Sequence, residues 1–254
     1  MDREVAATSG DVLALAQLVR RARSVVALTG AGISVPSGIP DFRTPGTGIW
    51  ENVDPMEVAH IDAWRAKPER FWSFYGERFQ TLGDKQPNGA HAALAELERR
   101  GRLEAVITQN IDMLHRRAGT RELIEVHGSI ETCSCLSCAE RVASAEVLDQ
   151  LEEVAVPRCV CGQPLKPDVV LFGEFLPAAA LQRATQLAER ADLLLCIGSS
   201  LEVYPVAQLP QLTLRHGGAV AIVTQGPTPY DAFAAVRLGG DVEQELQALA
   251  AALA

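Results

Sequence analysis

The stretch that decides the fold consists of Ser24-Val-Val-Ala-Leu-Thr29 followed directly by Gly30-Ala-Gly-Ile-Ser34. Its first six residues form an apolar run of strand length, and the run stops at a glycine turn. A strand that enters a glycine turn is typical of the start of a nucleotide-binding α/β unit. The turn matches only the first half of Gly-x-Gly-x-x-Gly, because Val35 occupies the third glycine position. The stretch therefore predicts a nucleotide-binding turn.

Outward from this stretch, apolar runs of strand length alternate with segments of helical periodicity. We expect helices at residues 11–23, 68–81, 88–100, 112–118, 178–190 and 242–253, and further strands at 103–108, 122–126, 169–172, 192–197 and 219–223. This alternation predicts an α/β fold with a Rossmann-like parallel sheet and helices on both faces. Residues 35–55 are rich in proline and glycine and are expected to form a long loop.

The composition limits the class of protein. The 254 residues suit one large domain or a domain with an inserted module. The formal net charge of -9 argues against binding to nucleic acid or to anionic membranes, which requires a basic surface. The N-terminus shows no secretory signal, and no stretch approaches the ~18 apolar residues of a membrane span. We therefore expect a cytoplasmic protein, in which cysteines are free or bind a metal.

Five of the six cysteines lie between residues 133 and 161. There, a Cys-x-x-Cys pair and a Cys-x-Cys pair are separated by a linker of zinc-ribbon size. Two close thiolate pairs can complete a tetrahedron around one zinc ion, and four thiolates make a closed, structural site. The alternative is a set of unrelated thiols; Cys133 is a spare that could replace a ligand, and Cys196 fits a core strand. The expected ligands are Cys135, Cys138, Cys159 and Cys161.

These features divide the chain into three parts. Residues 1–35, 88–127 and 169–254 are expected to form the Rossmann-like, nucleotide-binding domain. Residues 36–87 form a helical and loop insertion that belongs to a smaller domain, and residues 128–168 form the inserted zinc-binding module of that domain.

Several short segments together resemble the sirtuin family, and they follow one another in that family's order. The resemblance extends from about Val25 to Asp241 and implies an NAD-dependent enzyme that removes acyl groups from lysine side chains of proteins or peptides. It implies nicotinamide and O-acyl-ADP-ribose as products and one structural zinc. Besides the two cysteine pairs, the segments are Gly30–Ser34, Gly38-Ile-Pro-Asp-Phe-Arg43, Thr108-Gln-Asn-Ile-Asp112, His127-Gly128, Phe172-Gly-Glu174, Gly198-Ser-Ser200 and Val203-Tyr-Pro205.

The resemblance also implies a role for individual residues. His127 is the expected general base, and Asn110 is the second expected catalytic residue. Residues expected to bind the peptide, in part as added strands, are Phe172, Gly173, Glu174, Leu201 and Val203. Residues expected to bind NAD are Gly30, Ala31, Ile33, Asp41, Phe42, Arg43, Gln109, Asn110, Asp112, Gly198, Ser199, Ser200, Thr224, Asp241 and Val242.

Some of these assignments have alternatives or depart from the family pattern. His127 could be a structural hydrogen-bonding residue, Asp41 could only cap or turn its loop, and Asn110 could only make an Asx-turn. Many relatives have Asn at the end of the strand before Pro227, whereas this chain has Thr224 and Gln225. A substitute hydroxyl or amide would then meet the adenosine ribose, and NAD affinity is the property in question.

The expected helix at 68–81 bears on the acyl group. Phe71, Phe74, Tyr75 and Arg78 share one helical face. Tyr75 and Arg78 could together bind a carboxylate, as in sirtuins that remove succinyl, malonyl or glutaryl groups. Alternatively, Arg78 extends to water and Tyr75 is core. Asp41 is typical of relatives that prefer acetyl, so deacylation is predicted first and activity on acidic acyl groups is a hypothesis.

Three other functions compete with the deacylase. An ADP-ribosyltransferase would use the same NAD site without needing an acyl-lysine. A non-catalytic, zinc-bearing NAD sensor would bind NAD without releasing nicotinamide. A dehydrogenase fits least, because it requires an acidic residue after the second strand, where Thr108 and Gln109 stand.

Overall fold

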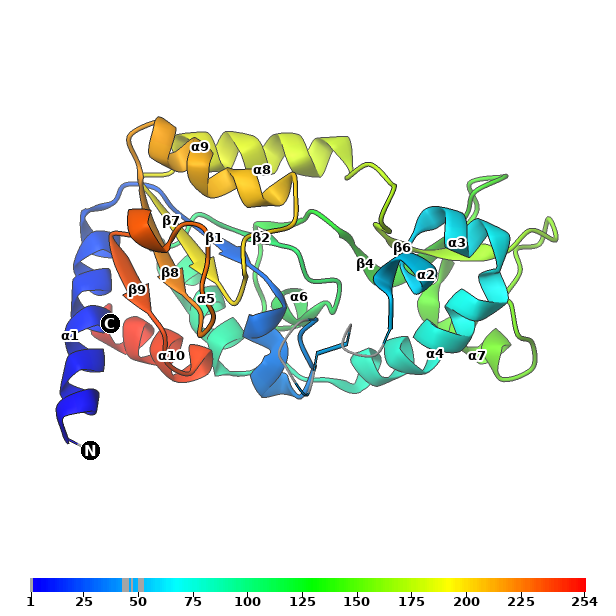
Figure 1. The fold of residues 1–254 in the computed structure, drawn as a ribbon, viewed down its shortest axis with the longest axis horizontal. Coiled ribbons are helices and arrows are strands. Elements are labelled where there is room, and N and C mark those ends of the chain that lie inside the picture. Colours follow the sequence, from blue (N-terminus) through cyan, green and yellow to red (C-terminus); the bar gives the residue numbers. More distant parts are fainter. Residues whose placement is uncertain (1, 43–45, 47, 50–52) are drawn as a thin grey trace.

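The computed structural model describes residues 2–42, 46, 48–49 and 53–254, and Figure 1 shows them arranged as a large and a small lobe. The large lobe contains a six-stranded sheet with the order β3-β2-β1-β7-β8-β9, in which all neighbours are parallel. The strands are β1 Val25–Thr29, β2 Ala105–Thr108, β3 Leu123–Glu125, β7 Leu193–Ile197, β8 Ala219–Val223 and β9 Val236–Leu238.

The order of the strands reverses between β1 and β7. Strands β2 and β3 lie on one side of β1, whereas β7, β8 and β9 lie on the other side. In open α/β sheets, ligands bind outside the carboxyl ends of the strands at such a switch point. Thr29 and Ile197 are register partners at these ends, so the glycine turn after Thr29 lies at the expected ligand site.

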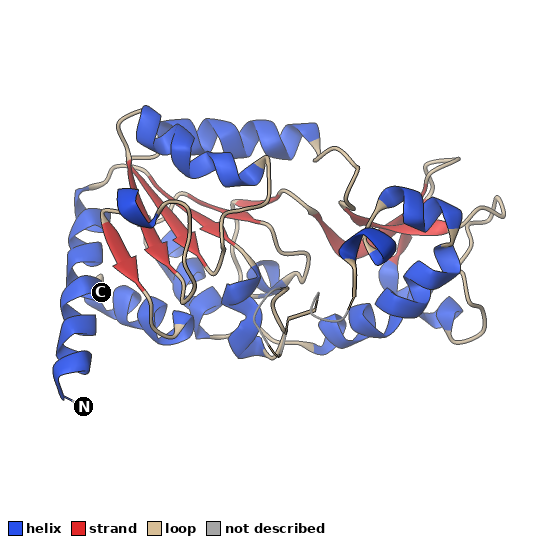
Figure 2. Cartoon of the chain, viewed as in Figure 1, coloured by secondary structure: helices blue, strands red, loops and turns tan. Residues whose placement is uncertain are grey.

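Helices cover both faces of the parallel sheet (Figure 2). Successive side chains of a strand point to opposite faces, and in β1 Ala27 enters one core while Leu28 enters the other. The first core packs against α1 Asp2–Arg21, α5 Gly89–Arg99 and α10 Val242–Ala252, and the second against α8 Ala178–Arg190 and α9 Leu209–Arg215. Because β1 is buried on both faces, its sequence is continuously apolar.

The small lobe has its own sheet and its own core. Its strands β4 Gly128–Cys135, β5 Arg141–Ala143 and β6 Leu165–Val169 pair antiparallel in the order β5-β4-β6. The core contains Phe71 and Trp72, and the Trp72 indole donates to the Leu165 carbonyl at 3.1 Å. The surrounding helices are α2 Pro55–Val58, α3 Ile61–Ala66, α4 Pro68–Asp84 and α7 Ser144–Leu151.

Short elements complete the described chain. They are α6 Leu114–Arg117 and the 3-10 helices Ala31–Ser37, Val206–Gln208 and Asp231–Phe233. None of the helices in the described part of the chain combines the length and the apolar character that crossing a membrane requires.

The structure confirms the α/β class, the parallel sheet and the separate module that carries the cysteines. The strand expected at residues 169–172 is wrong: β6 ends at Val169 and pairs antiparallel with β4 in the small sheet, not in the parallel sheet. The prediction treated the apolar run as a buried strand, whereas Phe172 is 43% exposed and forms only a single bridge, to His60. Strand β9 and helix α9 were not predicted, and α1 begins before the expected Asp11.

Candidate active site and metal centre

Two glycine turns meet at the switch point. The Gly30 amide donates to the Ile197 carbonyl at 2.9 Å, and the Gly32 amide donates to the Gly198 carbonyl at 2.8 Å. A Cβ on Gly32 would lie 2.7 Å from the Gly198 Cα, and Gly198 has φ +59°. Glycine is therefore required for the approach of the two turns. This contact brings the expected NAD residues of the first turn beside those that follow β7.

A polar network adjoins the first turn. The Asn110 side-chain amide donates to the Gly30 carbonyl and to the Ser34 hydroxyl, each at 3.1 Å. Ser34 in turn donates to the Asp112 carboxylate at 2.7 Å. Asp112 is 5% exposed, and its carboxylate also accepts the Leu114 amide at 2.9 Å. The structure therefore brings Asn110 and Asp112 together with the glycine turn. Ser34 joins them although sequence reasoning counted it only as part of a motif.

His127 follows β3 and is half-buried. Its Nδ1 lies 3.0 Å from the Gln109 carbonyl oxygen. Because a carbonyl only accepts hydrogen bonds, Nδ1 carries the proton and Nε2 retains its lone pair in the neutral ring. Burial lowers the pKa of His127, and the bond to the Gln109 carbonyl opposes this in part. A neutral imidazole with a lone pair at Nε2 suits a general base.

The residues expected to bind the adenosine part of NAD lie on several different elements. Gln109 links to the second turn by donating to the Ser199 hydroxyl at 3.0 Å. Thr224 directly follows β8, and its amide donates to the Leu238 carbonyl at 3.0 Å. Asp241 is the N-cap of α10 and accepts the Gln244 amide at 2.9 Å. Its carboxylate is therefore already engaged in capping. Of the other residues expected to bind NAD, Val242 is buried and Ser200 is half-buried.

The loop expected to close over NAD is described in part. The Asp41 carbonyl accepts the Ile49 amide at 3.0 Å, and the Phe42 ring is 40% exposed. Arg43 lies outside the described residues. The Asp41 backbone thus helps to close the turn of this loop, and the role of the Asp41 side chain stays a prediction.

The residues expected to bind the peptide lie at the junction of the lobes. The Phe172 amide and carbonyl pair with Ala59 and Ile61 at 2.8 and 2.9 Å. Gly173 has φ +84°, and a Cβ there would lie 2.7 Å from His60 Nε2. From the second turn, Leu201 is buried at φ +55° and Val203 is half-buried.

Helix α4 places Tyr75 and Arg78 differently from one another. The Tyr75 ring packs between Phe71 and Phe79, with ring centroids 4.7 and 5.3 Å apart. Arg78 is exposed, and its guanidinium carbon lies 3.8 Å from the centroid of the Phe74 ring. Arg78 also donates to the Phe74 carbonyl. Burial raises the pKa of Tyr75, and the positive charge of Arg78 opposes this in part. Both side chains also contact the Phe74 ring.

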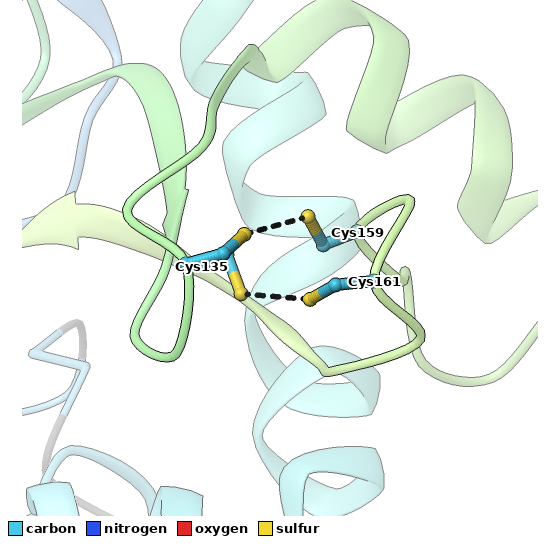
Figure 3. A group of neighbouring side chains, drawn as sticks. Cys135, Cys159 and Cys161 are labelled. Atoms are coloured by element: carbon cyan, nitrogen blue, oxygen red, sulfur yellow. Dashed lines mark hydrogen bonds between the residues drawn. The ribbon is translucent and has the colours of Figure 1, made fainter.

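Four cysteine sulfurs gather at one end of the small sheet, as Figure 3 shows for three of them. All four lie within 4.8 Å of one another, and two of the separations are 3.5 Å. A tetrahedron with Zn–S bonds of ~2.3 Å has edges of about 3.8 Å, so the group fits a zinc ion. The four are the predicted ligands Cys135, Cys138, Cys159 and Cys161.

The other two cysteines lie apart from this group. Cys133 is buried, its sulfur lies 3.5 Å from the Ser144 hydroxyl, and burial raises its pKa to about 11. It is therefore a packed thiol and not a member of the four-sulfur group. Cys196 is 1% exposed in β7 and belongs to the core, as predicted.

Two buried histidines lie near the ends of β1 and β2, and they were not predicted as part of the site. His91 and His115 are 0% and 2% exposed, and their ring centroids lie 4.8 Å apart. His115 Nε2 lies 2.9 Å from the Thr29 hydroxyl, which bonds to the Thr108 hydroxyl at 2.9 Å. Thr108 also accepts the Asn110 amide at 3.1 Å. The one signal in the sequence that could have indicated His115 is its position shortly after the Thr108–Asp112 segment.

Comparison with known proteins agrees with this geometry. The sequence model of the Sir2 family matches residues 30–205. An NAD-dependent protein deacetylase of Sulfolobus acidocaldarius is 47% identical over 221 residues, which cover 87% of this chain and 86% of the relative. An NAD-dependent protein deacylase of Thermococcus sibiricus is 43% identical over 237 residues, 92% of each chain.

Solved structures give the same result. A Sir2 structure with a deacetylated p53 peptide and 3'-O-acetyl ADP ribose has a TM-score of 0.90 at 43% identity, covering 92% of this chain and 95% of that one. A Sir2 complex with a p53 peptide and NAD+ has a TM-score of 0.85 at 44% identity, covering 91% and 93%. The chain therefore belongs to the Sir2 family, the sirtuins.

Proposed function

We propose that this sirtuin uses NAD as co-substrate to remove acetyl and related acyl groups from lysine side chains of proteins. The observation that carries the proposal is the set of groups at the switch point: the glycine turns, the Asn110–Ser34–Asp112 network, and His127 with its lone pair at Nε2. Relatives at 43–47% identity that bear deacetylase or deacylase names support it. So do the Sir2 complexes with NAD+ and with acetylated peptide.

The chain's own residues have distinct tasks in this reaction. NAD supplies the ribose carbon that takes up the acyl oxygen as nicotinamide leaves. Asn110 and Asp112 are fixed by Ser34 and would orient the nicotinamide ribose. His127 would take a ribose hydroxyl proton at Nε2 while Nδ1 stays bonded to the Gln109 carbonyl. Phe42 would shield the reacting carbon from water.

The peptide would bind as an added strand between the 171–174 and 201–203 segments. The Phe172 backbone already pairs with Ala59 and Ile61. Main-chain pairing with the peptide would therefore begin at Gly173, whose positive φ turns the chain at this point. On the other side, the buried Leu201 side chain would hold its backbone against the large lobe.

The acyl preference is proposed to be dual. Arg78 lies near Tyr75, so the pair could bind a carboxylate if Arg78 moves away from the Phe74 carbonyl. Asp41, by contrast, is the residue typical of relatives that prefer acetyl groups. Arg78→Met should abolish activity on a succinyl-lysine peptide and spare activity on an acetyl-lysine peptide. Arg70→Met is the matched control, because Arg70 on the same helix pairs with Glu57 instead. Equal loss on both peptides in Arg78→Met would contradict the assignment.

Nicotinamide release separates the deacylase from the competing functions. We would incubate the protein and NAD with an acetyl-lysine peptide or with the same peptide unacetylated, and measure nicotinamide in both. Release that requires the acetyl group supports the deacylase. Release together with ADP-ribose transfer to the unacetylated peptide would favour the transferase, and NAD binding without release would favour the sensor.

A further inference from the structure

A buried lysine links the small sheet to the segment proposed to bind the peptide. Lys166 is 6% exposed. Its ammonium nitrogen donates to the Pro167 carbonyl at 3.1 Å and the Val169 carbonyl at 2.8 Å, and it forms an ion pair with the Glu174 carboxylate at 2.9 Å. An ammonium group has three N–H donors; two of them bond to these backbone carbonyls, and the Glu174 carboxylate lies within ion-pair distance of the same nitrogen. A charge buried in this way requires its partners, because an unpaired buried charge is costly.

Glu174 uses the same carboxylate oxygen to close its own turn. This oxygen accepts the Leu171 amide at 2.8 Å, while the Glu174 amide donates to the Leu171 carbonyl at 3.0 Å. Gly173 lies inside the turn with φ +84°. The carboxylate is therefore directed into the protein, and Glu174 shapes the turn instead of reaching towards the peptide.

The turn is held from two sides. Lys166 is on β6, where it pairs in register with Ser134 of β4, next to the pair of Leu165 with Cys135. On the other side, Phe172 bridges to His60 between α2 and α3. The small sheet thus reaches the turn through the Lys166 side chain, and the helices reach it through the Phe172 backbone.

We propose that Lys166 is a positioning residue for the acyl-lysine peptide. By holding Glu174, it fixes the backbone of residues 171–174 in the shape to which the peptide adds as a strand. The inference rests on the proposed function, because that function makes this turn one edge of the peptide site. It assigns Lys166 no contact with peptide or with NAD, so its loss should affect the affinity for peptide and not that for NAD.

The test compares two dissociation constants in Lys166→Met. We would measure binding of a fluorescent acetyl-lysine peptide by anisotropy and binding of NAD by calorimetry. We expect peptide affinity to fall by about tenfold or more, which corresponds to ~1.4 kcal/mol of binding free energy, because the segment that pairs with the peptide loses its support. NAD affinity should stay within about twofold. Lys166→Arg keeps a cation that can pair with Glu174 and should recover much of the peptide affinity.

Arg141→Met is the matched control. Arg141 is on the same small sheet, but it is exposed and pairs with Asp168 at 3.1 Å. The substitution removes the same charge and should leave peptide affinity within about twofold. Equal weakening by Arg141→Met and Lys166→Met would show a charge effect and overturn the inference, as would equal weakening of peptide and NAD binding in Lys166→Met.

Two further outcomes keep the inference separate from folding and from the proposed function. If Lys166→Met does not fold, we would measure hydrogen exchange in Glu174→Gln instead. This substitution should speed exchange at the Leu171 amide and leave exchange in β7 unchanged. Unchanged exchange at Leu171 would overturn the inference. Wild-type protein that does not bind the acetyl peptide would overturn the proposed function and the inference together. Wild-type binding with unchanged affinity in Lys166→Met overturns the inference alone.

Discussion

Lowering the pH should destabilise this fold through two buried histidines. His91 and His115 are 0% and 2% exposed. Burial is the largest cause that lowers their pKa values, to about 4 for His91 and about 3 for His115. The charge of His91 further lowers the pKa of His115, whereas Asp112 and Glu243 oppose the shift of His91 in part. Both rings are therefore neutral in the folded protein over the range in which exposed histidines gain a proton.

The sign and the size of the effect follow from linkage. An unfolded histidine has a pKa of about 6.5, so below that pH the unfolded chain binds protons that the folded chain does not. Stability then falls as the pH falls, until it reaches the folded pKa values. At about pH 5, each histidine should lower the free energy of unfolding by about 2 kcal/mol relative to pH 7.5, or about 4 kcal/mol together.

Urea unfolding followed by circular dichroism at about pH 7.5 and about pH 5 measures this difference. Burial raises the pKa of Glu125 and of Glu245, which acts in the opposite direction in acid but equally in wild type and variant. In His115→Gln, the loss of stability between the two pH values should be smaller by about 2 kcal/mol. His216→Gln, at an exposed residue, should match wild type. The same pH dependence in His115→Gln as in wild type would refute the reasoning.

Three further predictions concern the switch point, the metal centre and the base. In Gly198→Ala, the new Cβ would lie 2.3 Å from the Ile33 backbone nitrogen, at φ +59°. The free energy of unfolding should therefore fall by about 1–3 kcal/mol or more, and calorimetry should show weaker NAD binding. Gly83→Ala, where the space around the glycine is open, should cause neither change. Cys138→Ser should remove most bound zinc by atomic absorption, whereas Cys133→Ser should retain it. His127→Ala should lower kcat for acyl removal about 10²–10⁴-fold with little change in NAD affinity.

The sequence predicts the centre of the fold better than its edges. Strand β1 is a continuous apolar run that is followed at once by two closely spaced glycines, so local pattern and tertiary position agree. Strand β9 has three residues, too few for a periodic signal. The run at 169–172 is apolar, but β6 pairing with β4 ends at Val169. Which sheet a strand joins depends on distant partners and not on its own residues.

The same limit applies to the site. The motif residues Asn110 and Asp112 were predicted, but their connection through Ser34 depends on how two turns meet in space. Helical spacing placed Tyr75 and Arg78 on one face, yet it did not reveal that Arg78 lies on the Phe74 ring, since spacing does not fix side-chain direction. Lys166 resembles a surface lysine in the sequence, and only the fold shows that it is buried against two backbone carbonyls and the Glu174 carboxylate.

The most direct test of the central claim is the mass of an acetyl-lysine peptide after incubation with the protein, with and without NAD. The proposed function predicts loss of the acetyl group only when NAD is present, with O-acetyl-ADP-ribose formed in equal amount to the deacetylated peptide. A peptide that keeps its acetyl group in the presence of NAD, with protein shown to be folded and zinc-loaded, would contradict it.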